Sequence, residues 1–374
     1  MRRLDLGFAG GAVGWNCYDR FISPSLSDLN MKIALVTDAW FPQVNGVVTT
    51  WSNVREQLSG LGHTFEVFHP GLFKTFTAPK YPEIKLAILP GRKLRRLVES
   101  FEPDAVHVAT EGPVGFAGRN WAVSTGTPFT TSYHTQFPQY LNTYFGAPTS
   151  PTWAFMRWFH GKAHRTLVPT RSIAEELAEH AFAAERLVVW TRGVQHDVFH
   201  PYPDDHTTLA ELPRPRFVYV GRVAPEKNIE AFLGLDLPGV KVVIGDGPAR
   251  QGLEQKYPDV HFAGFRKGEQ LARHIAACDV FVFPSLTDTF GVVMIEALAC
   301  GLPVAAYPVT GPRDVITRPE AGVLDDDLAA ACRGALKLDR EPCVAFARSF
   351  TWRRCAQMVL DNLAPLPRPA AAAG

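Results

Sequence analysis

The stretch "FPSLTDTFGVVMIEALACGLPVAAY" spans residues 283–307 and predicts a strand end, a polar loop, a helix and a second strand. Two acidic residues stand out in it. Asp288 lies in the loop and Glu296 in the otherwise apolar helix, with seven uncharged residues between them. A carboxylate among apolar side chains is unfavourable without a partner. Glu296 therefore either forms an ion pair with a nearby base or faces a cleft and accepts hydrogen bonds from ligand hydroxyl groups.

The alternation of strand and helix extends over most of the chain. A helical segment such as 48–63 follows nearly every strand. This alternation predicts an α/β fold with two Rossmann-like, doubly wound parallel-sheet domains that face a cleft. The strand-like runs lie at residues 32–38, 64–71, 105–110, 128–134 and 164–170, and then at 217–222, 241–247, 260–265, 280–285 and 302–308.

The length of 374 residues suits two domains. Met31 opens "MKIALVTDAW", which predicts the first strand, so residues 1–30 are expected to be a disordered extension. A polar, proline-rich segment at 202–216 predicts the linker between the two halves. The predicted division is 1–30 (extension), 31–201 (first Rossmann-like domain), 202–216 (linker), 217–345 (second Rossmann-like domain) and 346–374 (a C-terminal helix and a disordered tail).

The composition excludes several classes of protein. Hydrophobic residues make up 46% of the chain, charged residues 20%, and the net charge is +1. This balance does not favour nucleic acid as a partner, and any charged site must be local. No apolar run is long enough to span a membrane. The six cysteines form no CxxC pair, which is typical of reduced thiols and predicts a cytoplasmic protein.

The loop before the helix of Glu296 predicts an anion site. Thr289, Phe290 and Gly291 open this helix, and their backbone N–H groups lie at the positive end of its dipole. Gly291 has no Cβ, which lets an anion approach closely. The two oxygens of Glu296 suit a vicinal diol such as that of a ribose. The stretch therefore predicts a site for a ribose, a diphosphate and a second polar group near Asp288.

A second cationic loop follows another strand, in "VYVGRVAPEKN" (218–228). Arg222 can bind phosphate with two hydrogen bonds, and Lys227 offers a mobile point charge. The ordinary alternative is a pair of solvated surface cations. The order of strand, glycine, cations and helix favours a phosphate clamp at the carboxyl end of the strand.

The first half offers weaker signals. Asp38 lies at a strand end, and Asn45–Gly46 is a turn signal before a helix, which predicts a second anion site. His134 lies at another strand end, where a hydrogen-bonded rim residue is the ordinary explanation. Neither feature decides a function alone.

Several common sites are missing from the sequence. No strand is followed by GxGxxG, and no GxxxxGK[ST], HExxH or GxSxG occurs. The acidic runs at 203–205 and 325–328 lie in predicted loops. The sequence therefore predicts neither a bound cofactor nor a metal site.

Taken together, these segments resemble the retaining glycosyltransferases of the GT-B class in glycosyltransferase family 4 (glycosyl transferases group 1). This family includes sucrose synthases, phosphatidylinositol mannosyltransferases and bacterial glycolipid synthases. Its E-x7-E motif is matched here as Asp288-x7-Glu296, with an aspartate in place of the first glutamate. The segments that carry the resemblance are "TDAWFPQVNG", "SYHTQFPQY", "VGRVAPEKN", "IGDGPARQGLE", "FAGF" and "SLTDTFGVVMIEALACGLPVAAYPVTGPRDVI".

The resemblance implies a role for each matched residue. Residues 31–201 become the acceptor-side domain and 217–345 the nucleotide-sugar-binding domain. The implied roles are ribose binding by Glu296, sugar and diphosphate binding by Asp288, Thr289, Phe290 and Gly291, diphosphate binding by Arg222 and Lys227, phosphate approach by Gly46, sugar contact by His134, and base recognition by the backbone near Gly264 and Phe265.

The implied reaction is metal-independent transfer of a hexosyl unit from GDP-mannose or a UDP-hexose, with retention of configuration. The acceptor is expected to be a membrane lipid such as diacylglycerol or phosphatidylinositol, and a soluble or polysaccharide acceptor is the alternative. An epimerase or a phosphorylase on the same fold, and a noncatalytic nucleotide-sugar-binding protein, are further alternatives.

A basic segment predicts a surface that could bind a membrane carrying the lipid acceptor. The helix predicted within 85–106 carries apolar residues at helical spacing, with aromatic residues nearby. Such a surface suits docking to anionic lipid, so we expect a peripheral enzyme on the inner face of the cytoplasmic membrane. The alternative is an ordinary helix with solvated bases. The four bases are Arg92, Lys93, Arg95 and Arg96.

Overall fold

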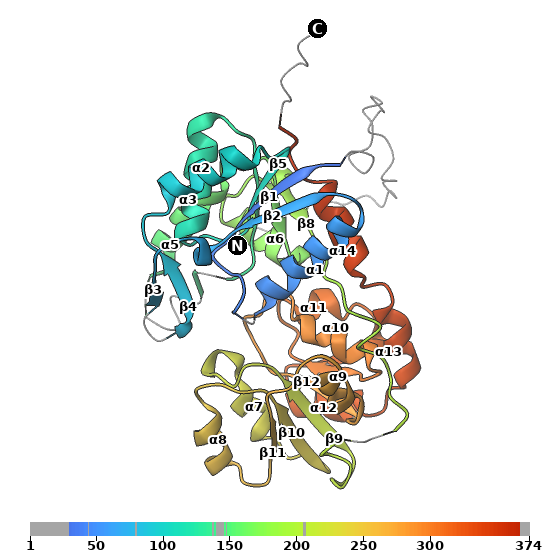
Figure 1. The fold of residues 1–374 in the computed structure, drawn as a ribbon. Helices are drawn as coiled ribbons and strands as arrows, with labels where there is room; N and C mark the ends of the chain where they lie inside the picture. The colour runs from blue at the N-terminus through green and yellow to red at the C-terminus, as the bar shows by residue number, and fades with distance from the viewer. Residues whose placement is uncertain are drawn as a thin grey trace, which may run out of the picture.

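The computed structural model describes residues 30–366, except 44, 79–80, 137, 140–145, 147 and 205–206. Residues 1–29 of the predicted extension and 367–374 of the predicted tail lie outside this description. Figure 1 shows two α/β domains, one above the other. The α/β prediction with two parallel-sheet domains is confirmed.

The N-terminal domain is built on a six-stranded parallel sheet in the order β2-β1-β5-β6-β7-β8. Its strands are β1 (Lys32–Val36), β2 (Thr64–Phe68), β5 (Ala105–Val108), β6 (Thr130–Ser132), β7 (Thr166–Val168) and β8 (Leu187–Val189). Its helices are α1 (Gly46–Gly60), α2 (Gly91–Phe101), α3 (Pro113–Thr125), α5 (Thr149–His160) and α6 (Arg171–Glu179).

The C-terminal domain repeats this arrangement in the order β11-β10-β9-β12-β13-β14. Its strands are β9 (Arg216–Val220), β10 (Val240–Ile244), β11 (His261–Gly264), β12 (Val280–Phe283), β13 (Val304–Ala306) and β14 (Gly322–Leu324). Its helices are α7 (Ile229–Leu233), α8 (Arg250–Lys256), α9 (Gly268–Ala276), α10 (Val292–Ala299), α11 (Pro312–Val315), α12 (Leu328–Ala335) and α13 (Arg340–Ala347).

Strand β1 shows why helices cover both faces of the sheet. Ile33 and Leu35 pack into a core with α1, whereas Ala34 and Val36 pack into a core with α2 and α3. Successive side chains on a strand point to opposite faces, so a strand that is apolar throughout needs cover on both sides. The same alternation in β9 separates the two cores of the C-terminal domain.

Each sheet reverses its strand order at one point. The chain moves outward from β1 to β2 and then resumes on the other side of β1 with β5. It does the same at β9 and β12. Ligands in open α/β sheets bind at the carboxyl ends of strands beside such a reversal. The loops after β9 and β12 are therefore the places where the fold favours a ligand.

The last helix, α14 (Trp352–Leu360), returns to the N-terminal domain and packs beside α1 (Figure 1). Two chain segments therefore cross between the domains, and they run side by side. The Val194 backbone N–H donates to the Phe350 carbonyl at 3.2 Å. Gly193 permits this approach, because a Cβ there would lie 2.3 Å from the backbone nitrogen of Trp352.

One element was not expected from the sequence. Strands β3 (Thr75–Ala78) and β4 (Tyr81–Ala87) form an antiparallel hairpin between β2 and α2. It lies outside the main sheet and projects beside α5 in Figure 1.

Candidate active site between the two domains

The loop after β12 has the backbone that its sequence suggests. Gly291 is the residue before α10 and has φ of +77°, where a side chain would be strained. A Cβ on Gly291 would also lie 2.8 Å from the Phe283 ring. Gly291 has no side chain that could cap α10. The first N–H groups of this helix therefore have no side-chain acceptor from the N-cap residue.

Glu296 lies in the second turn of α10. Among the described residues, its carboxylate has no hydrogen-bond or ion-pair partner, and burial is the only cause that shifts its pKa. Burial raises the pKa of the Glu296 carboxyl to about 7. An acid held in this way is poised to accept hydrogen bonds from a ligand.

Asp288 and Lys227 contact each other. The Lys227 ammonium donates to Oδ1 of Asp288 at 2.6 Å, and both side chains are about three-quarters buried. The other oxygen, Oδ2, is buried without a hydrogen-bond partner. The sequence predicted separate contacts of these two residues with a ligand, and the structure adds a direct ion pair between them.

The loop after β9 is tied to the loop after β12. Asn228 follows Lys227 with φ of +51°, and its Nδ2 donates to the Pro284 carbonyl at 3.0 Å. Arg222 lies at the start of the same loop, where its carbonyl accepts a hydrogen bond from the Tyr219 hydroxyl at 2.9 Å. The fold thus brings the loops of Arg222, Lys227 and Asp288 together.

Gly264 and Phe265 lie at the carboxyl end of β11, farther along the same edge. Gly264 has φ of +76°, and its carbonyl accepts a hydrogen bond from Gly245 at 3.0 Å. The Phe265 side chain is 54% exposed. An exposed aromatic ring at this edge is suited to stacking on a flat ligand group.

His134 faces these loops from the N-terminal domain. Its carbonyl accepts a hydrogen bond from the Thr289 hydroxyl at 2.9 Å, which links the two domains. Trp51 donates a hydrogen bond to its ring: the indole nitrogen of Trp51 lies 2.9 Å from Nε2 of His134. Burial, with the nearby charge of Arg192, lowers the pKa of His134 well below its usual range. The histidine is therefore neutral.

The other predicted residues of the N-terminal domain differ in their surroundings. Gly46 is the first residue of α1, and nothing lies within 4 Å of where its Cβ would be. Asp38 is occupied: it accepts from the backbone N–H groups of Val114 and Gly115 at 2.8 and 3.0 Å and from the Thr110 hydroxyl at 2.9 Å. Asp38 therefore satisfies the start of α3.

Two residues near His134 were missed in the sequence. Trp51 lies in the middle of α1, and Arg192 follows β8 and is only 3% exposed. The Arg192 guanidinium stacks on the Trp190 ring at 4.1 Å and lies 5.7 Å from the Phe290 ring. Nothing in their local sequence patterns indicates these contacts, which arise from the packing of separate elements.

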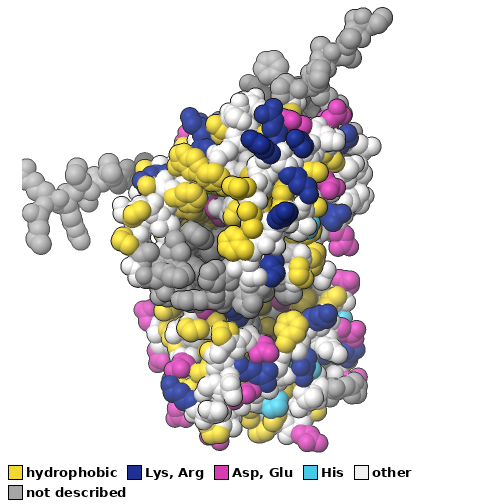
Figure 2. Space-filling view, turned by 60° about the vertical axis from the view of Figure 1, so that its left-hand side comes forward, with side chains coloured by type: hydrophobic (Ala, Val, Ile, Leu, Met, Phe, Trp, Pro, Cys, Tyr) yellow, Lys and Arg dark blue, Asp and Glu magenta, His cyan; other side chains and the backbone are white. Residues whose placement is uncertain are grey.

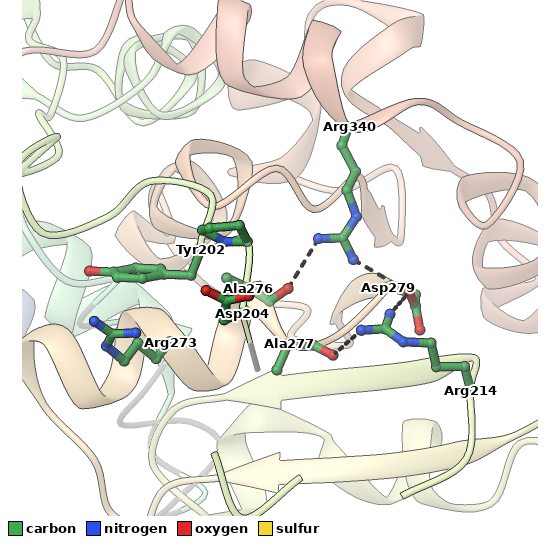
Figure 3. A pocket seen from close by; sticks show the side chains of 9 residues that line it. Tyr202, Asp204, Arg214, Arg273, Ala276, Ala277, Asp279 and Arg340 are labelled. Carbon is green, nitrogen blue, oxygen red and sulfur yellow. Dashed lines mark hydrogen bonds and ion pairs between the residues drawn. The ribbon is translucent and has the colours of Figure 1, made fainter. Parts of the chain in front are cut away.

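A cavity lies away from this site, near the amino ends of β9 and β12. It has a volume of about 300 Å³. Figure 3 shows that Arg214 and Arg340 both pair with Asp279 and also donate to carbonyl groups at the end of α9, including those of Ala276 and Ala277. These guanidinium groups have their hydrogen-bond partners within the protein. Their contacts therefore hold the linker, α9 and α13 together.

Two absences concern the part of the chain that the structure describes. No helix there combines the length and apolarity that crossing a membrane requires. No three or more His, Cys, Asp or Glu side chains there gather as a metal ion would need.

Two facing Rossmann-like domains, with charged loops at the carboxyl edge of the second sheet, define the GT-B class of glycosyltransferases. A sucrose-phosphate synthase from Thermosynechococcus elongatus has the same fold, with a TM-score of 0.70 at 21% identity, over 88% of this chain and 97% of that one. Anabaena HepE in complex with UDP matches with a TM-score of 0.65 at 17% identity, over 88% and 98%.

The chain belongs to glycosyltransferase family 4. The model of Glycosyltransferase Family 4 matches residues 44–198, and that of Glycosyl transferases group 1 matches residues 214–338. A GDP-mannose-dependent alpha-mannosyltransferase of Mycobacterium tuberculosis is 34% identical over 79% of this chain and 83% of that protein. An alpha-monoglucosyldiacylglycerol synthase of Streptococcus pneumoniae is 25% identical over 82% and 78%. The predicted family is confirmed, and the protein is a glycosyltransferase that uses nucleotide sugars.

Proposed function

We propose that this glycosyltransferase moves a hexosyl unit, with GDP-mannose as the first donor to test and UDP-hexoses as alternatives, to an acceptor hydroxyl with retention of configuration. The observation that carries the proposal is the unpartnered Glu296 carboxylate in the helix that begins just after Gly291. A half-buried acid beside a helix N-terminus suits the ribose and diphosphate of one ligand. The GDP-mannose-dependent relatives support the choice of donor.

The residues divide the work between the two domains. As the bond between the sugar and the diphosphate breaks, negative charge grows on the diphosphate. Arg222, Lys227 and the start of α10 stabilise that charge. His134 contacts the sugar, the acceptor oxygen bonds to the same face of the sugar carbon, and the acceptor proton passes to the leaving phosphate oxygen. Fixed cations carry the electrostatic role, so we propose that the reaction needs no metal ion.

A donor panel tests the reaction. The purified protein is incubated with GDP-mannose, UDP-glucose and UDP-glucuronate, a lipid extract or a simple alcohol, and EDTA, and the product is analysed by NMR for its anomeric configuration. We expect an α-linked product from one donor in the presence of EDTA. An inverted product, or activity that returns only with added Mn²⁺ or Mg²⁺, would contradict the proposed mechanism.

We further propose a lipid acceptor reached through the N-terminal domain. Arg92, Lys93, Arg95 and Arg96 are all exposed on α2, whereas Leu94 on the same helix is fully buried. Figure 2 shows basic side chains beside exposed hydrophobic ones on this domain. The exposed apolar residues near the start of α2 and on the adjoining hairpin are Leu89 (91% exposed), Ile88 and Phe76.

This mixture of bases and apolar side chains suits an anionic membrane surface, where each base contributes about 1 kcal/mol. Lys93 and Arg95 also bind groups of the protein, at 2.6 Å to the Leu72 carbonyl and 2.8 Å to Glu99, so their charges are partly engaged. The relatives include an alpha-monoglucosyldiacylglycerol synthase, which supports a lipid acceptor.

Vesicle sedimentation tests this surface. Reversal of all four α2 bases to Glu should abolish binding to phosphatidylglycerol vesicles at low salt and leave transfer to a soluble acceptor intact. A matched control reverses four exposed arginines elsewhere, Arg333, Arg348, Arg353 and Arg354, and should keep vesicle binding. A wild-type protein that ignores the vesicles would instead favour a soluble or polysaccharide acceptor.

A further inference from the structure

Two side chains contact the ring of His134 at a single nitrogen. Nε2 of His134 lies 2.9 Å from the indole nitrogen of Trp51 and 2.9 Å from the hydroxyl of Ser132. An indole nitrogen carries a hydrogen and cannot accept a hydrogen bond. Nε2 of His134 must therefore be the acceptor and carries no proton. In a neutral imidazole, the single proton then lies on Nδ1.

A chain of hydrogen bonds is compatible with the same assignment. The Thr130 hydroxyl lies 2.8 Å from Nδ1 of His107, and Nε2 of His107 lies 3.1 Å from the Ser132 hydroxyl. If Thr130 donates to His107, and His107 to Ser132, then the hydroxyl hydrogen of Ser132 is directed to His134. In this arrangement Ser132 accepts from His107 and donates to His134. The Ser132 hydroxyl also lies 3.2 Å from the Ala109 carbonyl, which competes for the same hydrogen.

The surroundings of His134 keep it neutral. Burial is the largest cause of its lowered pKa. Arg192, which follows β8, acts in the same direction, as do His107 of β5 and His160 at the end of α5. Protonation of Nε2 would also place an N–H group against the Trp51 N–H and lose that hydrogen bond.

We propose that Trp51 and Ser132 are positioning residues that hold His134 as the neutral tautomer with its proton on Nδ1, so that His134 offers the transferred sugar a hydrogen-bond donor. This inference rests on the proposed function. Among the described residues, Nδ1 has no hydrogen-bond partner of its own, and the histidine is partly exposed. The matching ligand group is an oxygen of the hexose, such as a hydroxyl or a uronate carboxylate. His134 then does not act as the base that accepts the acceptor proton.

The neighbouring Trp190 supplies a matched control. Its ring centroid lies 5.2 Å from that of Trp51 and 5.8 Å from that of His134. Its indole N–H donates to the Cys355 carbonyl at 3.0 Å and not to His134. Trp51→Phe and Trp190→Phe each remove one buried indole N–H from the same cluster, and only the first removes a donor to Nε2.

The first measurement needs no substrate. In protein labelled with ¹⁵N-histidine, the signals of His134 are identified by their loss in His134→Gln. We expect a protonated-type shift at Nδ1 and an unprotonated-type shift at Nε2, unchanged from pH 8 to pH 5.5. Trp190→Phe should keep this pattern. The double variant Trp51→Phe, Ser132→Ala should show a mixture of tautomers or titrate in this range. A proton on Nε2 of the wild type would overturn the proposal.

The second measurement is kinetic. Loss of the Trp51 donor should lower kcat/KM roughly 3- to 10-fold, as expected for one hydrogen bond, and add an acid-side decline to the pH–rate profile. Trp190→Phe should not add that decline. If both variants keep the tautomer and share one pH profile, the positioning role is excluded. A wild type with the expected tautomer but no transfer from any donor would count against the proposed function alone.

Discussion

The carboxyl edges of the two sheets have opposite chemistry. The edge of the C-terminal sheet carries ionic groups, with the Lys227–Asp288 ion pair and the Glu296 carboxylate around the loops of β9 and β12. At His134 the edge of the N-terminal sheet presents neutral groups: His134, Ser132 and Trp51 form hydrogen bonds without a full charge, and the charge of Arg192 lies near them. In the proposed reaction, the first edge would face the anionic leaving group and the second the sugar and its acceptor.

The largest effect should come from Lys227 at the edge of the C-terminal sheet. Lys227→Ala removes a charge that matters most as the diphosphate leaves, so we expect kcat to fall by about 100-fold or more. Steady-state kinetics with the active donor measure this. Lys256→Ala is the control, because Lys256 of α8 forms an exposed ion pair with Glu230 of α7 at 2.7 Å. Equal kinetics of both variants would show that the C-terminal edge does not handle the leaving group.

The next effect concerns Glu296. Glu296→Gln keeps the size of the side chain and removes the charge, and we expect kcat/KM to fall about 10- to 150-fold, as for loss of one charged hydrogen bond of about 1.5–3 kcal/mol. Without a ligand, the Glu296→Gln variant should be more stable than the wild type. The folded-state pKa of Glu296, about 7, lies above its unfolded value of 4.5. Wild-type stability therefore falls as the pH rises from 4.5 to about 7. Thermal unfolding at pH 5 and pH 8 tests this: the gain should appear at pH 8.

The neutral edge should respond to pH in the opposite direction. Burial and then the charge of His160 lower the pKa of His107 to about 3, and the pKa of His134 is lowered as well. Below about pH 6.5 the unfolded chain binds protons that the folded chain does not. The free energy of unfolding therefore decreases as the pH is lowered. The melting temperature should drop by a few degrees between pH 7 and pH 5. His107→Gln should reduce that drop, and a drop of unchanged size would contradict the assignment.

The smallest effect should come from Asp288→Glu, which restores the glutamate of the E-x7-E pattern. The longer side chain can still pair with Lys227 and loses slightly more rotamer freedom, so we expect a change in kcat/KM of about two- to fivefold. Asp288→Ala, measured in parallel, should lose more. A large loss in Asp288→Glu would show that the 2.6 Å contact with Lys227 sets the geometry of the site.

The sequence was most informative where the signal is local. The alternation of strands and helices predicted two doubly wound sheets, and the sequence singled out Gly291, whose positive φ and close neighbours require glycine. The pairing of Lys227 with Asp288 was not predicted, because it depends on how two loops 61 residues apart are joined. Trp51 and His134 are 83 residues apart and meet only once α1 packs on the sheet.

Local patterns were also ambiguous where one residue type has two uses. Asp38 follows a strand, where ligand-binding residues often lie, yet its carboxylate binds the first N–H groups of α3. The return of α14 to the N-terminal domain left no sequence signal either, because an amphipathic helix does not indicate which core it joins.

The position of α14 has a consequence for the synthesis of the chain. Its residues Trp352, Cys355, Val359 and Leu360 complete a core that also contains Trp51, Val54 and Leu58 of α1. A ribosome releases the strands of the N-terminal domain long before it releases this helix. The domain that is made first therefore exposes one apolar face until α14 emerges, whereas the C-terminal domain has all its helices once α13 emerges. The domain that is made first is thus the last to complete its core. A nascent chain stalled before Trp352 leaves that apolar face uncovered.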